Sequence, residues 1–298
     1  MKRISAEHAT CTLSKNHPSV ARAVSGETIV FQTLDCYGNQ IRSEAIDFTG
    51  IQGDFNNPAT GPLFVEGAMP GDILKISVLD IQVADQGVMV VRPGAGALGD
   101  VFQSSRVKIL PVKDGHAVFN DHLRIPLNPM IGVIGVAPLQ ETPTTVPHVH
   151  GGNMDCKRIV KGATLYLPVF VEGALLSIGD LHGVMADGEV VICAMEMEGE
   201  VTVKVKVIKE RKLPMPLVMA ADDFMVIASK ETLDEAAHTV THAMHGFLVH
   251  EVGMDTHEAG MLLSLLGELK ICQIVDPLMT TRMELPLAIL ESYGYRLP

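Results

Sequence analysis

The stretch GDILKISVLDIQV, residues 71–83, is a run of β-branched and other apolar residues that begins at a Gly-Asp turn pair. Runs of this kind, bounded by Gly, Pro, Asn or Asp, are typical of β-strands. Comparable runs are ETIVFQTLDC (27–36), ATLYLPVFVE (163–172) and GEVVICAMEM (188–197). In VTVKVKVIKERK (201–212) valines alternate with charged residues, which indicates a strand with one solvated face. We therefore expect a mainly β fold, a sandwich or barrel-like body, over residues 1–228.

The pattern changes after residue 228. In 229–251 apolar residues recur at helical spacing behind a polar start, and THEAGMLLSLLGEL (256–269) predicts a second helix that Asp255 or Thr256 can cap. KICQIVDP (270–277) returns to strand, and the remaining residues are expected to be irregular. We expect 229–298 to form an α+β portion packed on the body.

The pentapeptide FVEGA occurs twice in the chain. It starts FVEGAMPGD at residues 64–72 and FVEGALLSIGD at residues 170–180. Duplication of a β-unit would explain this repeat. Two unrelated strand–turn–strand corners would also produce it, because such turns favour Gly and Asp.

The composition of the chain excludes some classes of binding partner and indicates the cellular compartment. The 298 residues are 47% hydrophobic and carry a formal net charge of −12, which argues against nucleic acid and anionic membranes as partners. The uncharged stretch 130–139 is far shorter than a membrane helix. The start, MKRISAEHAT, lacks the apolar run of a secretory signal, and the five cysteines form no CxxC pair. These features predict a cytoplasmic protein without disulfides.

Two neighbouring segments contain most of the chemically versatile side chains. HVHGGNMDCK (148–157) offers His150 and Asp155 on either side of Gly151 and Gly152, whose small size lets the main chain approach a ligand. In SIGDLHGVMADGE (177–189), Asp180 and His182 alternate with a leucine, so on a strand they face the same way. Glu189 opens the next strand and supplies a further carboxylate.

Imidazole and carboxylate groups in this number suit a divalent metal that polarises a carbonyl group and activates water. The chemistry would then be hydrolysis. Histidine favours zinc, whereas carboxylates also admit calcium or manganese. The alternative is structural: the aspartates serve turns, His182 is a hydrogen-bonded core histidine, and Gly-Gly-Asn is a tight turn.

Two competing schemes use other residues. His238, His242 and His245 form one stripe on the first predicted helix, but HTVTHAMH lacks the glutamate of the HExxH pattern. Cys156 lies beside Lys157, which could lower the thiol pKa and produce a nucleophilic thiolate. If Asp155 faces the site on an extended backbone, Cys156 faces away.

GPLFVEGAMPGDILKISVLDI, HGGNMDCK and LPVFVEGALLSIGDLHGVMADGEV, in that order, together with Asp-Pro near the C-terminus, resemble the acetamidase/formamidase family over most of the chain. The resemblance implies hydrolysis of a short aliphatic amide, a β-rich fold with an α/β portion, a divalent metal near these motifs, and assembly as a homodimer or larger homo-oligomer. Carried over to this sequence, it implies that Asp155, Asp180 and His182 surround the metal, with His150 as a further candidate. Asn153 and Glu66 also match the family's motifs.

The expected mechanism uses metal-activated water, with Glu189 transferring a proton to the departing ammonia. Asn153 would hydrogen-bond the substrate or hold Asp155, while Gly151, Gly152 and Glu66 would line the substrate pocket. Two other functions remain compatible with the sequence: a non-catalytic β-rich protein that binds a small molecule, and a metal hydrolase of another small, cyclic amide.

Overall fold

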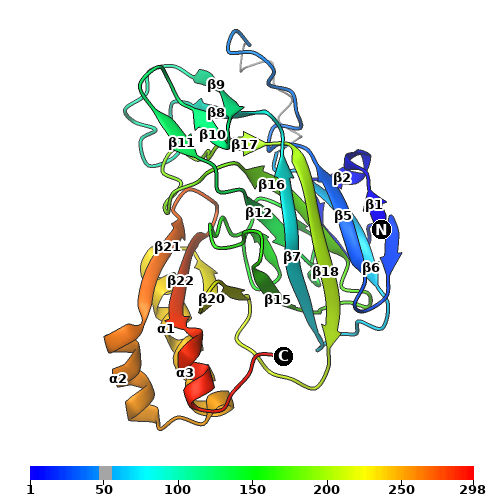
Figure 1. Ribbon diagram of the computed structural model, residues 1–298, viewed down its shortest axis with the longest axis vertical. Coiled ribbons are helices and arrows are strands. Elements are labelled where there is room, and N and C mark those ends of the chain that lie inside the picture. The colour runs from blue at the N-terminus through cyan, green and yellow to red at the C-terminus, as the bar shows by residue number, and fades with distance from the viewer. Residues whose placement is uncertain (47–55) are drawn as a thin grey trace.

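The computed structural model describes residues 1–46 and 56–298, and most of its regular structure is β-strand. One large sheet has nine strands. In spatial order they are β1 (Lys2–Ile4), β5 (Thr28–Thr33), β18 (Gly199–Ile208), β7 (Ile73–Val83), β15 (Thr164–Pro168), β19 (Leu217–Ala220), β20 (Asp223–Lys230), β22 (Met279–Pro286) and β21 (Glu268–Gln273). In Figure 1 the long strands β7 and β18 run side by side in front of the second sheet.

The second sheet has eleven strands. Its main path is β11 (Arg124–Pro126), β10 (His116–Val118), β9 (Arg106–Lys113), β8 (Gln86–Val91), β17 (Glu196–Met197), β16 (Leu176–His182), β12 (Met130–Gly135) and β14 (Gly151–Asn153). Beside β16 it continues into β6 (Ala59–Val65), which pairs with β2 (Ala9–Thr10) and β4 (Ala21–Ala23). A separate pair joins β3 (Thr12–Leu13) to β13 (Thr142–Pro143).

The main hydrophobic core lies between the two sheets. Phe31 and Ile76 come from the nine-stranded sheet, and Ile134 and Ile178 come from the eleven-stranded sheet; all four belong to one buried cluster. Burial of apolar side chains from two facing sheets is the main stabilising contribution in a β-sandwich. The predicted mainly β body is confirmed, including the solvated strand β18, in which Lys204 and Lys206 are exposed.

The two FVEGA segments are corners that carry the chain from one large sheet to the other. The first joins β6 to β7, and the second joins β15 to β16. The strands then pair reciprocally, β6 with β16 and β7 with β15. The corners also bond directly: Val65 N–H donates to the Gly173 carbonyl at 2.9 Å, and Gly173 N–H donates to the Ala68 carbonyl at 2.8 Å. This reciprocal arrangement supports a duplicated strand–corner–strand unit.

The C-terminal part contains most of the helical residues. Its helical segments are α1 (Leu233–Phe247), the π-helical turn η3 (Leu248–Val252), α2 (Thr256–Leu266) and α3 (Leu287–Ser292), while a short 3-10 helix, η1 (Ala6–His8), lies near the N-terminus. Asp255 caps α2 by accepting the N–H groups of His257 and Glu258, as expected. The residues after 277, expected to be irregular, instead form β22 and α3.

The helices cover an extension of the nine-stranded sheet. Val240 and Phe247 of α1 pack with Phe224 of β20 and Met283 of β22 in a second buried cluster. Strand β20 crosses the expected boundary at residue 228, and β22 pairs with it over its whole length. One continuous sheet therefore spans both parts of the chain. Within the described residues, no helix combines the length and apolar composition needed to cross a membrane.

Candidate functional site

A polar cavity of about 350 Å³ lies beside the end of β16. Strand β16, the loop that follows it and several segments distant in the sequence contribute to its wall. The lining includes Cys36, Asn57, Arg92, Asn153, Asp180, His182, Glu189, Glu196 and Asp276. A small enclosed site rich in carboxyl groups is unusual enough to indicate a functional role.

His182 lies at the centre of the ionisable groups. It is the cross-strand partner of Glu196 where β16 pairs with β17. Its Nε2 atom is 3.2 Å from Glu196 Oε2 and 3.6 Å from Asp180 Oδ1, while its Nδ1 atom is 3.8 Å from Asp155 Oδ1. All four side chains are buried. The imidazole ring therefore separates Asp155 from Asp180 and Glu196.

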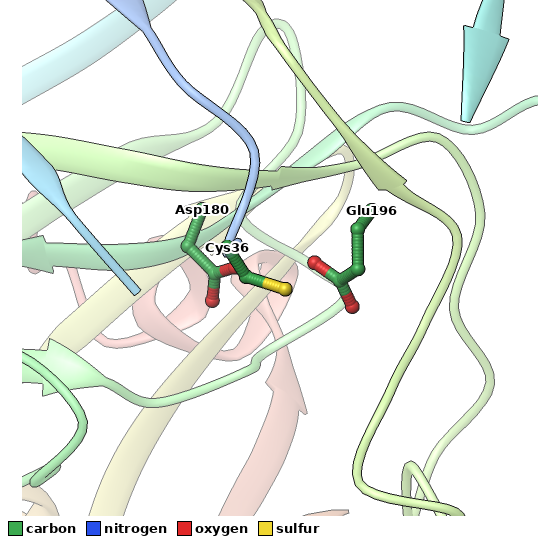
Figure 2. Close-up of side chains that lie close together, drawn as sticks. All are labelled: Cys36, Asp180 and Glu196. Atoms are coloured by element: carbon green, nitrogen blue, oxygen red, sulfur yellow. The ribbon is translucent and has the colours of Figure 1, made fainter. Parts of the chain in front are cut away.

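The possible ligand atoms form two groups of three. Asp155, His182 and Glu189 each offer one atom within 4.8 Å of the others, and Cys36, Asp180 and Glu196 do the same. In Figure 2 the Cys36 thiol and the Glu196 carboxyl group point toward each other, with Asp180 beside the thiol.

The backbone is unusual at three of these acids. Asp155, Asp180 and Glu189 have φ angles of 44°, 54° and 45°, in the left-handed region that side-chain-bearing residues seldom adopt. Such conformations cost about 1–3 kcal/mol each and concentrate at functional sites. The extended backbone assumed for residues 155 and 156 is therefore absent at Asp155.

Gly132 of β12 provides the space between the two aspartates. A Cβ atom at this position would lie 2.6 Å from Asp155 Oδ1 and 2.6 Å from Asp180 Oδ2. Because no side chain fits there without displacing a carboxyl group, the close approach of both acids to β12 depends on glycine.

Several buried polar atoms in the site have no hydrogen-bond partner among the described residues. They are Asp155 Oδ1 and Oδ2, Asp180 Oδ1, His182 Nδ1, Glu196 Oε2 and Asn153 Oδ1. Leaving such atoms unsatisfied costs about 1–3 kcal/mol each, and more when they are charged. A cluster of them indicates a ligand, a cation or water in the functioning protein.

Burial and mutual repulsion shift the pKa values of the acids. Burial raises the pKa of Asp180 to about 6, against the effect of His182. Burial and the neighbouring Asp276 raise the pKa of Asp155, and burial likewise raises the pKa of Glu189. A bound cation would favour the ionised form of each carboxyl group.

For His182 and Glu196, the pKa shifts favour the charged forms: the pKa of His182 is raised and that of Glu196 is lowered. Burial lowers the pKa of His182, but the Glu196 and Asp180 carboxylates outweigh burial and leave it well above its usual value. Burial alone would raise the pKa of Glu196, yet His182 holds it below the usual value. The Ala194 N–H also donates to Glu196 Oε1 at 2.8 Å. Glu196 is therefore held ionised against the imidazole.

Other contacts fix the surrounding acids. Asn57 Nδ2 donates to Asp180 Oδ2 at 3.0 Å, and Asn153 Nδ2 donates to Asp276 Oδ2 at 2.9 Å. The loop that carries Glu189 is held by its neighbours: Asp187 accepts two hydrogen bonds from the buried Arg282, at 2.7 and 2.8 Å. The C-terminal strands thus position a residue of the β-rich body.

The structure brings five of the expected site residues together: Asn153, Asp155, Asp180, His182 and Glu189. The remaining expected residues, Glu66, His150, Gly151 and Gly152, lie outside this group.

Glu66 is remote from the cavity lining: its side chain is 52% exposed and lies 3.8 Å from Arg22, because the FVEGA corner faces solvent there. His150, Gly151 and Gly152 are buried, but they do not line the cavity. A Cβ atom at Gly152 would lie 2.3 Å from the Val146 carbonyl oxygen and 3.2 Å from His150 Nε2, so the packing of β14 needs glycine here. His150 Nε2 is buried and has no hydrogen-bond partner among the described residues. The roles expected for Glu66 and His150 stay predictions.

The structure also locates the residues of the two alternative schemes. Cys156 is buried in the main core. A hydrogen bond with Cys272 lowers the pKa of its thiol, and this effect outweighs burial, which raises it. It is not part of the cavity lining. His238 and His242 are exposed on α1, with their Nε2 atoms 3.1 Å apart, and also lie outside this cavity.

Sequence reasoning missed Cys36, Asn57, Glu196 and Asp276. Glu196 falls in the run GEVVICAMEM, where an acidic residue at a predicted buried position was an available signal. Asp276 belongs to the Asp-Pro pair near the C-terminus. Nothing local in the sequence indicates that Cys36 and Asn57 would reach this cavity.

Comparison with known proteins agrees with this fold. The profile of the Acetamidase/Formamidase family matches residues 2–147 and 140–292. The chain therefore belongs to the acetamidase/formamidase family, as the sequence motifs predicted.

Two relatives illustrate the range of similarity. The formamidase of Methylophilus methylotrophus is 27% identical over 67% of this chain and 69% of its own length. The acetamidase of Mycolicibacterium smegmatis is 28% identical over 50% of this chain and 53% of its own length. Among the curated relatives that it matches, the chain spans between 53% and 69% of their length.

Solved structures match over nearly the whole chain. The crystal structure of an acetamidase from Bacillus halodurans is 47% identical, covers 98% of this chain and 99% of its own, and superposes with a TM-score of 0.97. An acetamidase from Yersinia enterocolitica is 26% identical, covers 97% of this chain and 92% of its own, and gives a TM-score of 0.91.

Proposed function

We propose that this protein hydrolyses the C–N bond of a short aliphatic amide, such as formamide or acetamide, to a carboxylate and ammonia. The observation that carries the proposal is a group of ionisable side chains at one place. His182, Glu189 and Asp276 line a small polar cavity, and the buried Asp155 does not line it but lies next to His182. The names of the relatives, formamidase and acetamidase, agree with it. We also propose a cytoplasmic location, since no disulfide joins any of the cysteines in the described residues.

We further propose that the site holds a divalent metal ion. The residues fit such an ion: both oxygens of Asp155 and the Nδ1 atom of His182 are buried and lack hydrogen-bond partners among the described residues. With Glu189 they form one of the two compact groups of ligand atoms. Three protein ligands, one of them histidine, suit zinc best, with manganese or calcium as alternatives. When bound, such an ion polarises a carbonyl oxygen and lowers the pKa of water.

This ligand set differs from the expected one in the position of Asp180. Asp180 and Glu196 face the Nε2 side of His182, whereas Asp155 faces Nδ1. We assign Asp180 and Glu196 to hold the imidazole, so that Nε2–H donates to a carboxylate and Nδ1 is free to bind the ion. His150 has no place in this set.

The proton needed by the leaving group comes, in this proposal, from Asp276. Its carboxyl group lines the cavity and is fixed by the amide of Asn153. It can donate a proton to the amide nitrogen as the C–N bond breaks and recover one from the attacking water. The products are then the carboxylic acid and ammonia, which become carboxylate and ammonium when the acid's proton passes to ammonia, and Asp276 returns to its initial state.

The cavity also has room for larger amides. Its volume of about 350 Å³ exceeds what formamide or acetamide fills and lies in the range of pockets for larger ligands. Longer or cyclic amides are therefore the second candidate substrates.

The test measures ammonia release from a panel of linear amides of increasing length and small lactams. The purified protein is assayed as isolated, after prolonged chelation, and after return of zinc, manganese or calcium. We expect turnover of short linear amides, about one divalent ion per chain, and loss of activity on chelation. Full activity of a protein shown to be metal-free would contradict the metal proposal. No ammonia from any amide with the metal restored would favour a non-catalytic binding protein.

A further inference from the structure

Two histidines on the exposed side of α1 contact each other. His238 and His242 lie one helical turn apart, both are exposed, and their Nε2 atoms are 3.1 Å apart. Residues four apart on a helix are neighbours on its surface. The ring centroids are 4.2 Å apart at an interplanar angle of 36°. The two rings therefore lie side by side and meet through the same nitrogen of each ring.

The packing of α1 holds this pair in place. Val240 and Met244, on the other side of the helix, are buried in the cluster that contains Phe224. This division into a buried side and an exposed side is typical of an amphipathic helix on a protein surface. Since the buried side fixes the backbone, the two rings meet without any movement of the main chain.

Two kinds of interaction fit this contact. One ring can donate an N–H group to the nitrogen of the other, or both nitrogens can offer a lone pair to one cation. An ion about 2.0–2.1 Å from each nitrogen, the usual zinc–imidazole distance, would bind the two atoms at an angle of about 100°. This angle lies between those of square-planar and tetrahedral sites. The observed spacing therefore suits a chelated metal ion without rearrangement.

The charges beside the pair also favour a cation. His238 lines an open groove of about 770 Å³, whose other ionisable lining residues are His148, Lys230, Glu231, Asp234 and Glu235. Three carboxyl groups thus outnumber one ammonium group in the groove. Asp234 and Glu235 precede His238 by four and three residues, so they lie on the same face of α1. Negative charge of this kind raises the local concentration of cations.

We propose that His238 and His242 together bind a divalent transition-metal ion in a site separate from the cavity. Imidazole ligands suit Cu²⁺, Zn²⁺ and Ni²⁺, and Cu²⁺ binds most tightly of the three. Among the described residues, no third histidine, cysteine or acid completes a compact group of three with the pair, so water takes the remaining positions. Neither histidine lines the cavity beside β16, and the proposal does not depend on amidase activity.

The first experiment follows copper binding by electron paramagnetic resonance. The purified protein is loaded with zinc and desalted, so that any stronger site is already filled, and Cu²⁺ is then added in steps. We expect a copper signal split by two imidazole nitrogens, because both rings bind the ion. The group of Asp155, His182 and Glu189 contains one histidine, so copper there would give a one-nitrogen signal.

Substitution of each histidine tests the assignment. His238→Gln and His242→Gln should each lose the two-nitrogen signal and bind Cu²⁺ at least about tenfold more weakly. Glutamine has a good helix propensity and both positions are exposed, so circular dichroism should show an intact fold. His257→Gln is the matched control: it removes an exposed histidine of α2 whose ring lies 3.6 Å from Asp255, and it should keep the signal.

The second experiment avoids copper, which can oxidise thiols. An ion that binds both rings stabilises the folded protein, because the pair is brought together only in the folded helix. Ni²⁺ added to the zinc-loaded protein should raise the Tm of the wild type and of His257→Gln. It should raise the Tm of His238→Gln and His242→Gln much less.

A wild-type copper signal without two imidazole nitrogens would overturn the proposal. A two-nitrogen signal and a Ni²⁺-dependent rise in Tm that both persist unchanged in His238→Gln and His242→Gln would place the ion elsewhere and also overturn it.

Discussion

His182 and Glu196 are cross-strand neighbours, and Nε2 of the histidine lies 3.2 Å from Oε2 of the glutamate. In the proposed metal site, this contact gives the two ring nitrogens different roles. Nε2 lies nearest the Glu196 and Asp180 carboxyl groups. Nδ1 is farther from its nearest carboxyl group, that of Asp155, and lacks a hydrogen-bond partner among the described residues. A carboxylate behind a ligating histidine fixes its tautomer and increases its basicity.

Glu196→Gln should therefore weaken metal affinity about 10- to 100-fold, with a comparable loss of activity at limiting metal. The amide keeps the shape of the side chain but lacks the negative charge that stabilises the imidazole proton. Metal titration followed by calorimetry, with amidase rates at each metal concentration, measures the effect. Glu198→Gln, a surface residue that pairs with Arg42, is the matched control. Unchanged metal affinity in Glu196→Gln would remove Glu196 from this role.

Glu189→Gln and Asp276→Asn should separate metal binding from proton transfer. If Glu189 is a ligand, its variant loses bound metal, and excess metal restores part of the rate. If Asp276 carries the proton, its variant keeps the metal but loses about 100- to 10,000-fold in kcat. Elemental analysis and kcat are measured on the same samples. Full metal content in an inactive Glu189→Gln would return Glu189 to the proton-transfer role expected from the sequence.

Gly132→Ala should disrupt the site because the added methyl group would lie 2.6 Å from carboxyl oxygens of both Asp155 and Asp180. We expect loss of metal and activity, with destabilisation of about 1–3 kcal/mol from overpacking. Thermal unfolding and metal analysis report the two effects. Gly260→Ala is the control: it lies in α2 with open space around it, and the change should be neutral or stabilising by up to about 1 kcal/mol. Wild-type metal binding in Gly132→Ala would show that the acids can move apart.

Cys156→Ala should keep turnover within about tenfold of the wild type, equivalent to about 1.4 kcal/mol on the barrier. The thiol is buried in the main core and is not part of the cavity lining. Loss of several orders of magnitude in a metal-replete variant, or an acyl adduct on Cys156 seen by mass spectrometry, would instead support the thiolate mechanism. Cys36→Ala is informative beside it, since Cys36 does line the cavity.

The sequence predicted the parts of the site that are close together along the chain. Asp180 and His182 lie two residues apart on one strand, and Asp155 follows the Gly-Gly-Asn segment of β14, so local periodicity sufficed to group them. The positive φ of Asp180 was not predictable, because Asp180 lies within a strand, where an extended backbone is expected.

The residues that were missed reach the site through long-range pairing. Glu196 meets His182 only because β17 pairs with β16, and Asp276 follows a strand at the far end of the nine-stranded sheet. The order of strands in a sheet depends on how whole faces of the sheets pack together. A short segment of sequence carries no information about that packing. Glu66 lies at an exposed corner, away from this cavity, and its expected substrate-binding role stays a prediction.

The hydrogen bonds between Arg282 and Asp187 limit how this protein can be engineered. From the sequence, residues 229–298 look like a separate C-terminal part that could be removed. They nevertheless supply Arg282, Asp276 and the strand segment that pairs with Gly188. A fragment ending at residue 228 would cut β20, uncover the core beneath α1 and release the loop that carries Glu189. The chain therefore cannot be truncated at residue 228 and remain intact. Chimeric proteins made within the family should take residues 1–228 and 229–298 from the same parent.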